Sequence, residues 1–280
     1  MIDQIQKRAA ELLTQKQVAV VIGYEQGSEP SRVRPCFITK PEDAKRLVWN
    51  KFCFHNLATY LTRDEVMKLG KPAIIAKGCD SRAIVCLIQE AQLKREDVYI
   101  LGVACEGVGE PLAAKCRACK VNTPPLCDEL IGPKIEPKAA QDDPLAEVKA
   151  LDGKSLDERW AFWQKEFERC FRCYACRQAC PLCYCDRCIV EKNQPQWIET
   201  SAHQRGNLAW HIIRAFHLAG RCIGCGECER ACPMGIKLTL LNKKLAKEVE
   251  AHFQYVPGLD VEAEPALAAF RQEDDEEFIR

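Results

Sequence analysis

Two stretches of the chain repeat one spacing of cysteines: CFRCYACRQACP at residues 170–181 and CIGCGECERACP at residues 222–233. In each stretch three cysteines lie three residues apart, and a fourth follows directly before a proline. Three thiolates so close in sequence can surround one side of a metal cluster. The local backbone does not bring the fourth cysteine round to the same cluster, so it reaches the other one. The repeat therefore predicts two metal sites that exchange one ligand.

We expect each of these sites to hold a 4Fe–4S cluster, and the exchange of ligands assigns the cysteines. The first cluster takes Cys170, Cys173, Cys176 and Cys232, and the second takes Cys222, Cys225, Cys228 and Cys180. This pairing holds two clusters close together, as a relay for single electrons requires. Zinc is the alternative, but zinc sites favour two pairs of cysteines around one tetrahedral ion, which fits the spacing poorly.

Residues Cys170–Leu241 resemble bacterial-type two-cluster ferredoxin domains, with a long insert between the motifs. Forty-one residues separate Cys180 from Cys222. The stretch GRCIGCGECERACPMGI, residues 220–236, is similar to the iron–sulfur subunits of heterodisulfide-reductase-type assemblies. The insert carries three further cysteines, which either form an additional metal site or lie near the first cluster as hydrogen-bonding thiols: Cys183, Cys185 and Cys188.

The composition narrows the class of protein. The chain has 280 residues and 19 cysteines, and its 40 Lys and Arg balance its 40 Asp and Glu, so the basic excess of a nucleic-acid binder is absent. No apolar stretch is long enough to span a membrane, and residues 1–17 are too charged for a secretory signal. We therefore expect a cytoplasmic protein, in which thiols stay reduced and metal ligation is favoured over disulfides.

The first half of the chain has the pattern of a small α/β domain. Residues 3–17 predict an amphipathic helix, and the apolar runs 18–22, 72–76 and 98–103 predict buried strands. Residues 81–97, between the last two runs, carry apolar side chains at helical spacing. Strands without polar alternation, joined by a helix, predict a parallel sheet that is covered on both faces.

The second half is predicted to be mainly helical. A capping box at Ser155 and Glu158 begins one helix, and two others cover about residues 207–218 and 239–252. Their apolar faces would keep water away from the clusters. Three tryptophans are expected in this core, and three histidines in packing or surface positions: Trp160, Trp163 and Trp210, and His203, His211 and His217.

The fold class expected is therefore α+β and multidomain, with a small α/β domain followed by a mainly helical dicluster ferredoxin domain. The α/β domain covers residues 1–130, and a Pro-, Lys- and Asp-rich linker covers 131–154. The ferredoxin-like domain covers residues 155–255, and an acidic tail covers 256–280.

The α/β domain carries cysteines where two predicted strands end. KGCDSR at 77–82 and VACEGVG at 103–109 both lie at the carboxyl edge of the sheet, where such folds bind ligands. A further pair follows in the next loop. Four cysteines could thus ligate a third 4Fe–4S cluster or a zinc ion: Cys79, Cys105, Cys116 and Cys119, with Cys53 or Cys127 as substitutes. Alternatively they are scattered buried cysteines, as we expect for Cys86.

The KGCDSR segment has a second interpretation. It opens a predicted helix, whose N-terminus could bind an anion such as a flavin pyrophosphate through Gly78, Asp80, Ser81 and Arg82. Plain capping of the helix by Asp80 or Ser81 is the alternative.

At these residues the chain resembles the beta-subunit family of deazaflavin-linked hydrogenases and formate dehydrogenases. The stretches that carry the resemblance are LVWNKFCFHNLATYL (47–61), KGCDSRAIVCLIQE (77–90), VYILGVACEGVGE (98–110), KCRACKVNTPPLCDELIG (115–132) and RCFRCYACRQACPLCYCDRC (169–188). It extends from about Val20 to Leu241. The resemblance implies electron transfer between a flavin, iron–sulfur clusters and a partner's active site. Some members bind FAD and reduce a deazaflavin, and those members are longer than this chain.

The function expected is an iron–sulfur electron-transfer subunit of a cytoplasmic redox complex. Its catalytic partner would be a formate dehydrogenase, hydrogenase or heterodisulfide-reductase-like subunit. One alternative is an FAD-containing oxidoreductase subunit with its own two-electron site in the α/β domain. Another is an iron–sulfur redox sensor, although no DNA-reading helix with basic flanks accompanies the cysteines.

Overall fold

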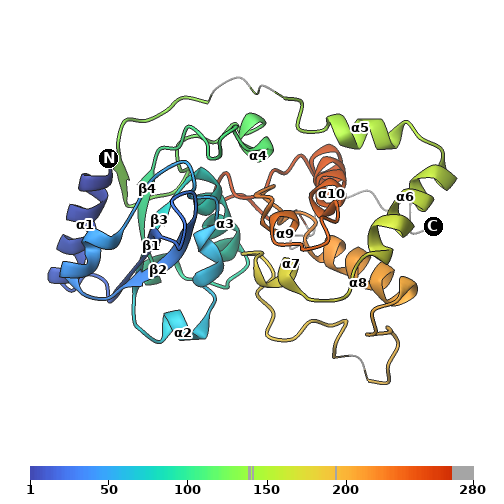
Figure 1. Cartoon of the computed structure of the whole chain (residues 1–280), viewed down its shortest axis with the longest axis horizontal. Helices are drawn as coiled ribbons and strands as arrows, with labels where there is room; N and C mark the ends of the chain where they lie inside the picture. The colour runs from blue at the N-terminus through green and yellow to red at the C-terminus, as the bar shows by residue number, and fades with distance from the viewer. Residues whose placement is uncertain (138–139, 141, 193, 267–280) are drawn as a thin grey trace.

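The computed structural model of the chain describes residues 1–137, 140, 142–192 and 194–266. The N-terminal half is built around a sheet, and α5 to α10 lie beside it (Figure 1). In the described part of the chain, every helix is too short or too polar to cross a lipid bilayer.

The sheet has five strands in the order β2-β1-β3-β4-β5. The strands are β1 (Val20–Gln26), β2 (Val33–Ile38), β3 (Pro72–Ala76), β4 (Tyr99–Val103) and β5 (Glu129–Ile131). Strand β2 pairs antiparallel with β1, and the other pairs are parallel. The predicted α/β fold with a largely parallel sheet is therefore confirmed.

Helices cover both faces of this sheet, which explains its uninterrupted apolar strands. Helix α1 (Ile2–Thr14) and the 3₁₀ turn η1 (Pro41–Arg46) pack on one face. Helix α3 (Gly78–Gln89) and the 3₁₀ turn η2 (Leu57–Tyr60) pack on the other. Successive residues of β3 point to opposite cores, so that every position of this strand is buried.

The remaining elements of this half are short. They are α2 (Asp64–Met67), the 3₁₀ turn η3 (Arg95–Asp97) and α4 (Ala114–Arg117), which carries Cys116.

The second half contains α5 (Ala146–Asp152), α6 (Leu156–Glu168), α7 (Ala175–Gln178), α8 (Gln204–His217), α9 (Glu227–Arg230) and α10 (Leu238–Phe253). The predicted capping box is present at the start of α6. Ser155 Oγ accepts a hydrogen bond from the Glu158 backbone N–H, and the Glu158 carboxylate accepts one from the Ser155 N–H.

The segment predicted as an extended linker differs from expectation, because it contains α5. Lys244 and Lys247 of α10 both bind the Asp152 carboxylate at the end of α5, so this helix is attached to the second half. Residues 138, 139 and 141 of the predicted linker, and residues 267–280 of the predicted acidic tail, lie outside the described residues.

Helix α3 joins the two halves. Leu182, Leu218 and Ile223 of the second half belong to the same apolar core as α3. The Arg82 guanidinium donates to the carbonyl oxygens of Ile223, at 3.2 Å, and of Pro257, at 2.7 Å. The loop that carries the second cysteine motif is therefore held directly against the α/β domain.

Candidate metal centres

The first predicted cysteine set gathers where α7 packs against α9. Cys176 lies in α7, Cys170 and Cys173 precede that helix, and Cys232 follows α9. Burial raises the pKa of Cys170, and the thiols of Cys173 and Cys232 raise it further. Burial also raises the pKa of Cys176, with the Cys183, Cys170 and Cys232 thiols adding to the increase. The four predicted ligands therefore share one neighbourhood.

The second predicted set lines one cavity. Its wall is formed by Cys180, Cys222, Cys225 and Cys228, together with Pro181, Leu182, Leu218, Ile223, Gly224, Gly226, Thr239 and Asn242. Cys180 comes from the first motif and the other three cysteines from the second. The cavity thus joins the two motifs in the way that an exchange of ligands requires, and its largely apolar wall suits a buried cluster.

The two motifs form the same tight turn. Arg172 and Tyr174 have left-handed backbone conformations (φ 63° and 58°), and Gly224 and Gly226 occupy the matching places with φ 71° and 72°. For a non-glycine residue this conformation costs about 1–2 kcal/mol. The turn points the Arg172 N–H at Cys170 Sγ, 3.4 Å away, and the Gly224 N–H hydrogen-bonds Cys222 in the same way. Such N–H groups stabilise a thiolate ligand.

An apolar layer covers one side of the first set, whereas Cys173 is exposed on the other. Phe167 of α6, Trp210 of α8 and Leu238 of α10 are buried and pack with the cysteines. Trp163 packs against this core, but Trp160 is 51% exposed and lies at the surface, so the prediction of a buried Trp160 is wrong. Exclusion of water by such a layer is one of the factors that set the reduction potential of a cluster.

Within residues 1–137, 140, 142–192 and 194–266, no three His, Cys, Asp or Glu side chains lie close enough together to hold a single metal ion. Ligands of a cubane lie further apart than ligands of one ion, because four irons lie between them.

The three surplus cysteines have different surroundings. Cys183 is adjacent to Cys180, and hydrogen bonding from that thiol lowers the pKa of Cys183. Cys188 packs with the core around Trp210, and Cys185 is exposed. An additional metal site at these residues stays a prediction.

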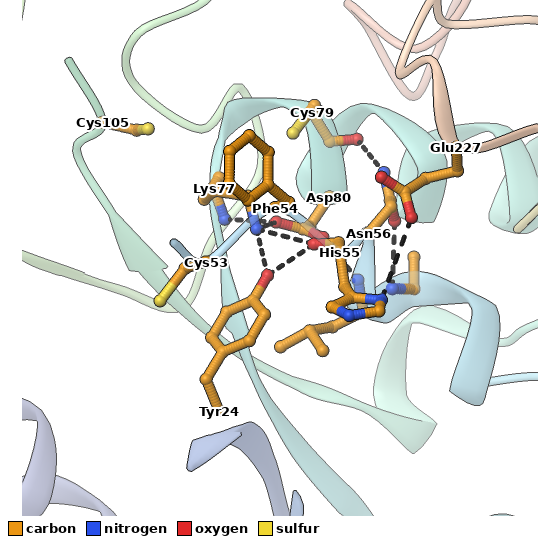
Figure 2. A network of polar contacts seen from close by, with 12 residues as sticks. Tyr24, Cys53, Phe54, His55, Asn56, Lys77, Cys79, Asp80, Cys105 and Glu227 are labelled. Carbon is orange, nitrogen blue, oxygen red and sulfur yellow. Dashed lines mark hydrogen bonds and ion pairs between the residues drawn. The ribbon is translucent and has the colours of Figure 1, made fainter. Parts of the chain in front are cut away.

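The carboxyl edge of the sheet holds a buried polar network (Figure 2). The Lys77 ammonium, 2% exposed, contacts the Tyr24 hydroxyl and donates to the His55 carbonyl oxygen at 2.9 Å. It also pairs with the Asp80 carboxylate at 2.9 Å. Burial lowers the pKa of Lys77, but Asp80 and Tyr24 more than offset this and hold it well above its usual value. Lys77 therefore remains charged inside the domain.

Several predicted ligand cysteines surround this ammonium group. Figure 2 shows the thiols of Cys53, Cys79 and Cys105 around Lys77. Burial raises the pKa of all three thiols, and the positive charge of Lys77 partly offsets this increase in each. Cys116 is a further neighbour that raises the pKa of Cys105.

The other two candidates of this domain have contacts in their own loops. Cys119 Sγ accepts a hydrogen bond from the Val121 N–H of its own loop. Cys127 lies against Gly102 of β4, where a Cβ on that glycine would be 3.1 Å from the thiol. Because the Cys119 N–H donates to the Cys116 carbonyl oxygen at 3.2 Å, Cys119 also adjoins the group, and the fourth ligand beside Cys79, Cys105 and Cys116 stays a prediction.

The polar groups of Asp80, Ser81 and Arg82, which were predicted to bind a flavin, form hydrogen bonds to other parts of the protein. The Asp80 carboxylate accepts from the backbone N–H groups of Leu57 and Lys77, and Ser81 Oγ exchanges hydrogen bonds with the backbone of Leu126. Arg82 holds the second half, as described above. A Cβ on Gly78 would lie 2.1 Å from the Val121 oxygen, so the start of α3 is covered. Flavin binding here stays a prediction.

A charged bridge connects this domain to the second cysteine motif. Lys115, adjacent to Cys116, donates to the Phe54 carbonyl oxygen at 2.9 Å and pairs with Glu227 at 3.4 Å. Glu227 is 2% exposed and lies between Cys225 and Cys228, and Arg230 also pairs with it. The Lys115 side chain passes Gly226, whose Cβ would lie 3.8 Å from Lys115 Cδ.

Sequence reasoning missed the charged residues that adjoin the cysteines. Lys77 stands two residues from Cys79, and this position in KGCDSR was an available signal. Asn207, His211 and Arg214 recur on one face of α8 at spacings of four and three residues, and a polar stripe within a predicted core helix was a second signal.

Comparison with known proteins agrees with this geometry. The family described as the 4Fe-4S dicluster domain matches residues 169–237. The F420-dependent formate dehydrogenase subunit beta of Methanocaldococcus jannaschii is 24% identical, and the alignment covers 89% of each chain. The F420-dependent formate dehydrogenase 1 subunit beta of Methanococcus maripaludis is 23% identical, with 88% of each chain covered.

The alignment with the first relative runs over 348 positions, more than the 280 residues of this chain, so the relative has segments without a counterpart here. The predicted resemblance is nevertheless confirmed: over most of its length this chain is similar to beta subunits of F420-dependent formate dehydrogenases, and it contains a 4Fe–4S dicluster domain.

Proposed function

We propose that this chain is the iron–sulfur electron-transfer subunit of a cytoplasmic redox complex. It would relay single electrons between the catalytic centre of a partner subunit and another carrier. The relatives are named as beta subunits of formate dehydrogenases. We therefore propose a formate dehydrogenase as the catalytic partner, with a hydrogenase or a heterodisulfide-reductase-like subunit as the other candidates.

The observation that carries this proposal is the cavity lined by Cys180, Cys222, Cys225 and Cys228. One wall of cysteines drawn from two motifs fits a 4Fe–4S cluster, which supplies one-electron chemistry when bound. Cys170, Cys173, Cys176 and Cys232 would hold the first cluster. The chain's own contribution is to fix the thiols, donate backbone N–H groups to them and exclude water.

Anaerobic iron and sulfide analysis, combined with EPR spectroscopy after dithionite reduction, tests the proposal. We expect the iron content of at least two cubanes per chain and the spectrum of two interacting reduced clusters. Reconstituted protein that holds less than this amount of iron, or one tetrahedral ion per site, would contradict it.

We further propose a third cluster in the α/β domain, held by Cys79, Cys105 and Cys116 with Cys53 or Cys119 as the fourth ligand. The grouping of Cys53, Cys79 and Cys105 around a charged lysine supports this, because a cationic neighbour stabilises thiolates. Iron content distinguishes the alternatives. Cys53→Ser would lower it by one cubane if Cys53 is the ligand, and Cys119→Ser would do so if Cys119 is.

The contacts between the domains support an order for the relay. Lys115 and Glu227 connect the α/β site to the second cluster site, whereas Cys173 of the first site is exposed and Phe171 beside it is 55% exposed. We propose that electrons pass from the α/β domain (residues 1–130) through the second and then the first cluster. Both clusters would lie in the domain of residues 155–255, and the partner would approach near Phe171.

Flavin binding is a separate hypothesis with a separate test. A flavin at the start of α3 would have to replace the internal contacts of Asp80, Ser81 and Arg82. Acid release of flavin from the purified complex decides this point. A flavin-free supernatant would leave the chain as a relay without a two-electron site of its own.

A further inference from the structure

Arg214 of α8 is an unusual buried charge. Its side chain is 5% exposed, Nη2 donates to the Cys176 carbonyl oxygen at 3.1 Å, and Nε has no hydrogen-bond partner. An arginine stays charged in proteins. None of the ion pairs that the described residues form includes Arg214. A buried charge without a carboxylate partner requires another negative group nearby.

The groups near Arg214 that carry negative charge as thiolates are cysteines of both predicted cluster sites and Cys183 of the insert. Burial lowers the pKa of Arg214, but the thiolates of Cys183, Cys180, Cys228 and Cys176 more than offset this and raise it. Cys176 belongs to the first predicted site, and Cys180 and Cys228 belong to the second. Arg214 contacts the Cys176 carbonyl oxygen of the first site, and Leu218, at the end of the same helix, lines the cavity of the second site. The guanidinium is therefore placed where α8 adjoins both sites.

The insert between the two motifs supplies this residue and anchors it. On the same face of α8, Asn207 Nδ2 donates to the carbonyl oxygens of Phe167, at 3.0 Å, and Cys170, at 2.7 Å. Arg172 of the first motif donates in return to the Gly206 carbonyl oxygen at the start of α8. The helix is thus tied to the first motif at both Cys170 and Cys176, which fixes the position of Arg214.

We propose that Arg214 is a shared electrostatic partner of the two iron–sulfur sites, with its free Nε–H available to a sulfur atom between them. This inference rests on the proposed function. An electron added to either site increases the negative charge beside Arg214, so the guanidinium makes reduction of both sites more favourable. A cation next to one site alone would affect mainly that site. If Arg214 acts on both sites, its replacement by a neutral residue should therefore change the midpoint potentials of both clusters.

The test measures the midpoint potentials of both clusters by EPR-monitored redox titration of the full-length holoprotein. Arg214→Gln removes the charge, and Arg214→Lys retains it. We expect Arg214→Gln to make the reduction equilibrium of both clusters about tenfold less favourable, which is about 59 mV for one electron. We expect Arg214→Lys to keep both potentials close to wild type. Arg205→Gln, at an exposed position of the same helix, is the matched control and should change neither.

Each outcome decides the inference. Full iron content in Arg214→Gln with both potentials unchanged would overturn it. Loss of iron from Arg214→Gln, with iron retained in Arg214→Lys, would support it, because the charge alone separates the two variants. Loss of iron from both variants would instead assign Arg214 to support of the Cys176 backbone and overturn the electrostatic role. Wild-type protein without clusters would refute the proposed function itself, and the wild-type iron content shows this separately.

Discussion

At the scale of single residues, Cys180 is the sharpest test of the ligand exchange. It follows the first motif in sequence but lines the cavity of the second. We expect Cys180→Ser to lose the EPR signal and the iron of one cluster, the second, while the first remains largely intact. Cys185→Ser changes an exposed cysteine of the insert and should keep both clusters. Selective loss of the first cluster in Cys180→Ser would contradict the pairing.

A second prediction concerns His211 and the pH dependence of the free energy of unfolding, rather than redox chemistry. Burial, and then the charges of Arg214 and Arg172, lowers the pKa of His211 from 6.5 to about 3. In the unfolded chain His211 takes up a proton near pH 6.5, whereas in the folded chain it stays neutral. The contribution of neutral His211 to the free energy of unfolding is therefore fully present above pH 6.5. It is lost as the pH falls towards 3, at up to about 1.4 kcal/mol per pH unit.

The measurement is urea unfolding of the anaerobic holoprotein at about pH 7 and about pH 5. The free energy of unfolding of wild type should decrease by about 2 kcal/mol more than that of His211→Leu over this interval. His217→Leu, at an exposed position of the same helix, should retain the wild-type pH dependence. Parallel curves for wild type and His211→Leu would remove His211 as the cause.

At the scale of elements, α3 holds the segment after α10 through a close backbone contact. Gly258 has φ +79°, and a Cβ there would lie 2.4 Å from the Arg82 carbonyl oxygen. Gly235 has φ +59° but nothing within 4 Å of its Cβ position. We expect Gly235→Ala to cost about 1–2 kcal/mol through backbone strain alone. Gly258→Ala should cost more, because it also separates this segment from α3.

Limited proteolysis and urea unfolding compare these two variants. Release of the segment would break the hydrogen bonds from Arg82 to Pro257 and from Tyr255 to Gln89, so cleavage in residues 254–266 should become faster only in Gly258→Ala. Equal stability and equal cleavage of the two variants would show that the contact does not hold the segment.

The elements that could be predicted from the sequence are those whose residue pattern carries its own physical signal. β3 is a fully buried parallel strand and β4 is buried except at Tyr99, and a continuous apolar run is typical of such strands. β2 was missed because it mixes buried and exposed residues without a regular period, contains Pro35 and pairs antiparallel at the edge. β5 is only three residues long. α5 buries one side chain, Val148, so its apolar signal is weak.

The same distinction applies to the candidate site. Cysteine spacing is a local property, so the first two ligand sets could be read from the sequence. The position of Arg214 beside both sites depends on how α8 packs, and the Lys115–Glu227 pair joins residues 112 positions apart. Contacts between residues so far apart in the chain cannot be predicted from a local sequence pattern.

At the scale of the whole molecule, the two halves share one apolar core. Cys79 of the α/β domain and Cys180, Cys222 and Cys225 of the second predicted site pack against this core, whereas cysteines of the first predicted site pack in a separate core. Arg214 is on a helix that adjoins both sites of the second half, whereas Lys115 connects the α/β site to the second cluster site. Burial lowers the pKa of Lys115, but Cys79, Glu227 and Cys225 more than offset this and raise it, which places its charge beside both domains. The two cations should therefore have different redox effects.

Replacement of Lys115 by Met tests this arrangement of the whole molecule. The variant removes a positive charge next to Cys225 and leaves the first cluster site unchanged. We therefore expect the midpoint potential of the second cluster alone to become more negative, by about 60 mV for a tenfold change in a one-electron equilibrium. Lys68→Met, at an exposed position of the α/β domain, should leave both potentials unchanged. If Lys115→Met lowers the potential of the first cluster instead, the first cluster must be the one nearer the α/β domain, and the proposed order of the relay is reversed.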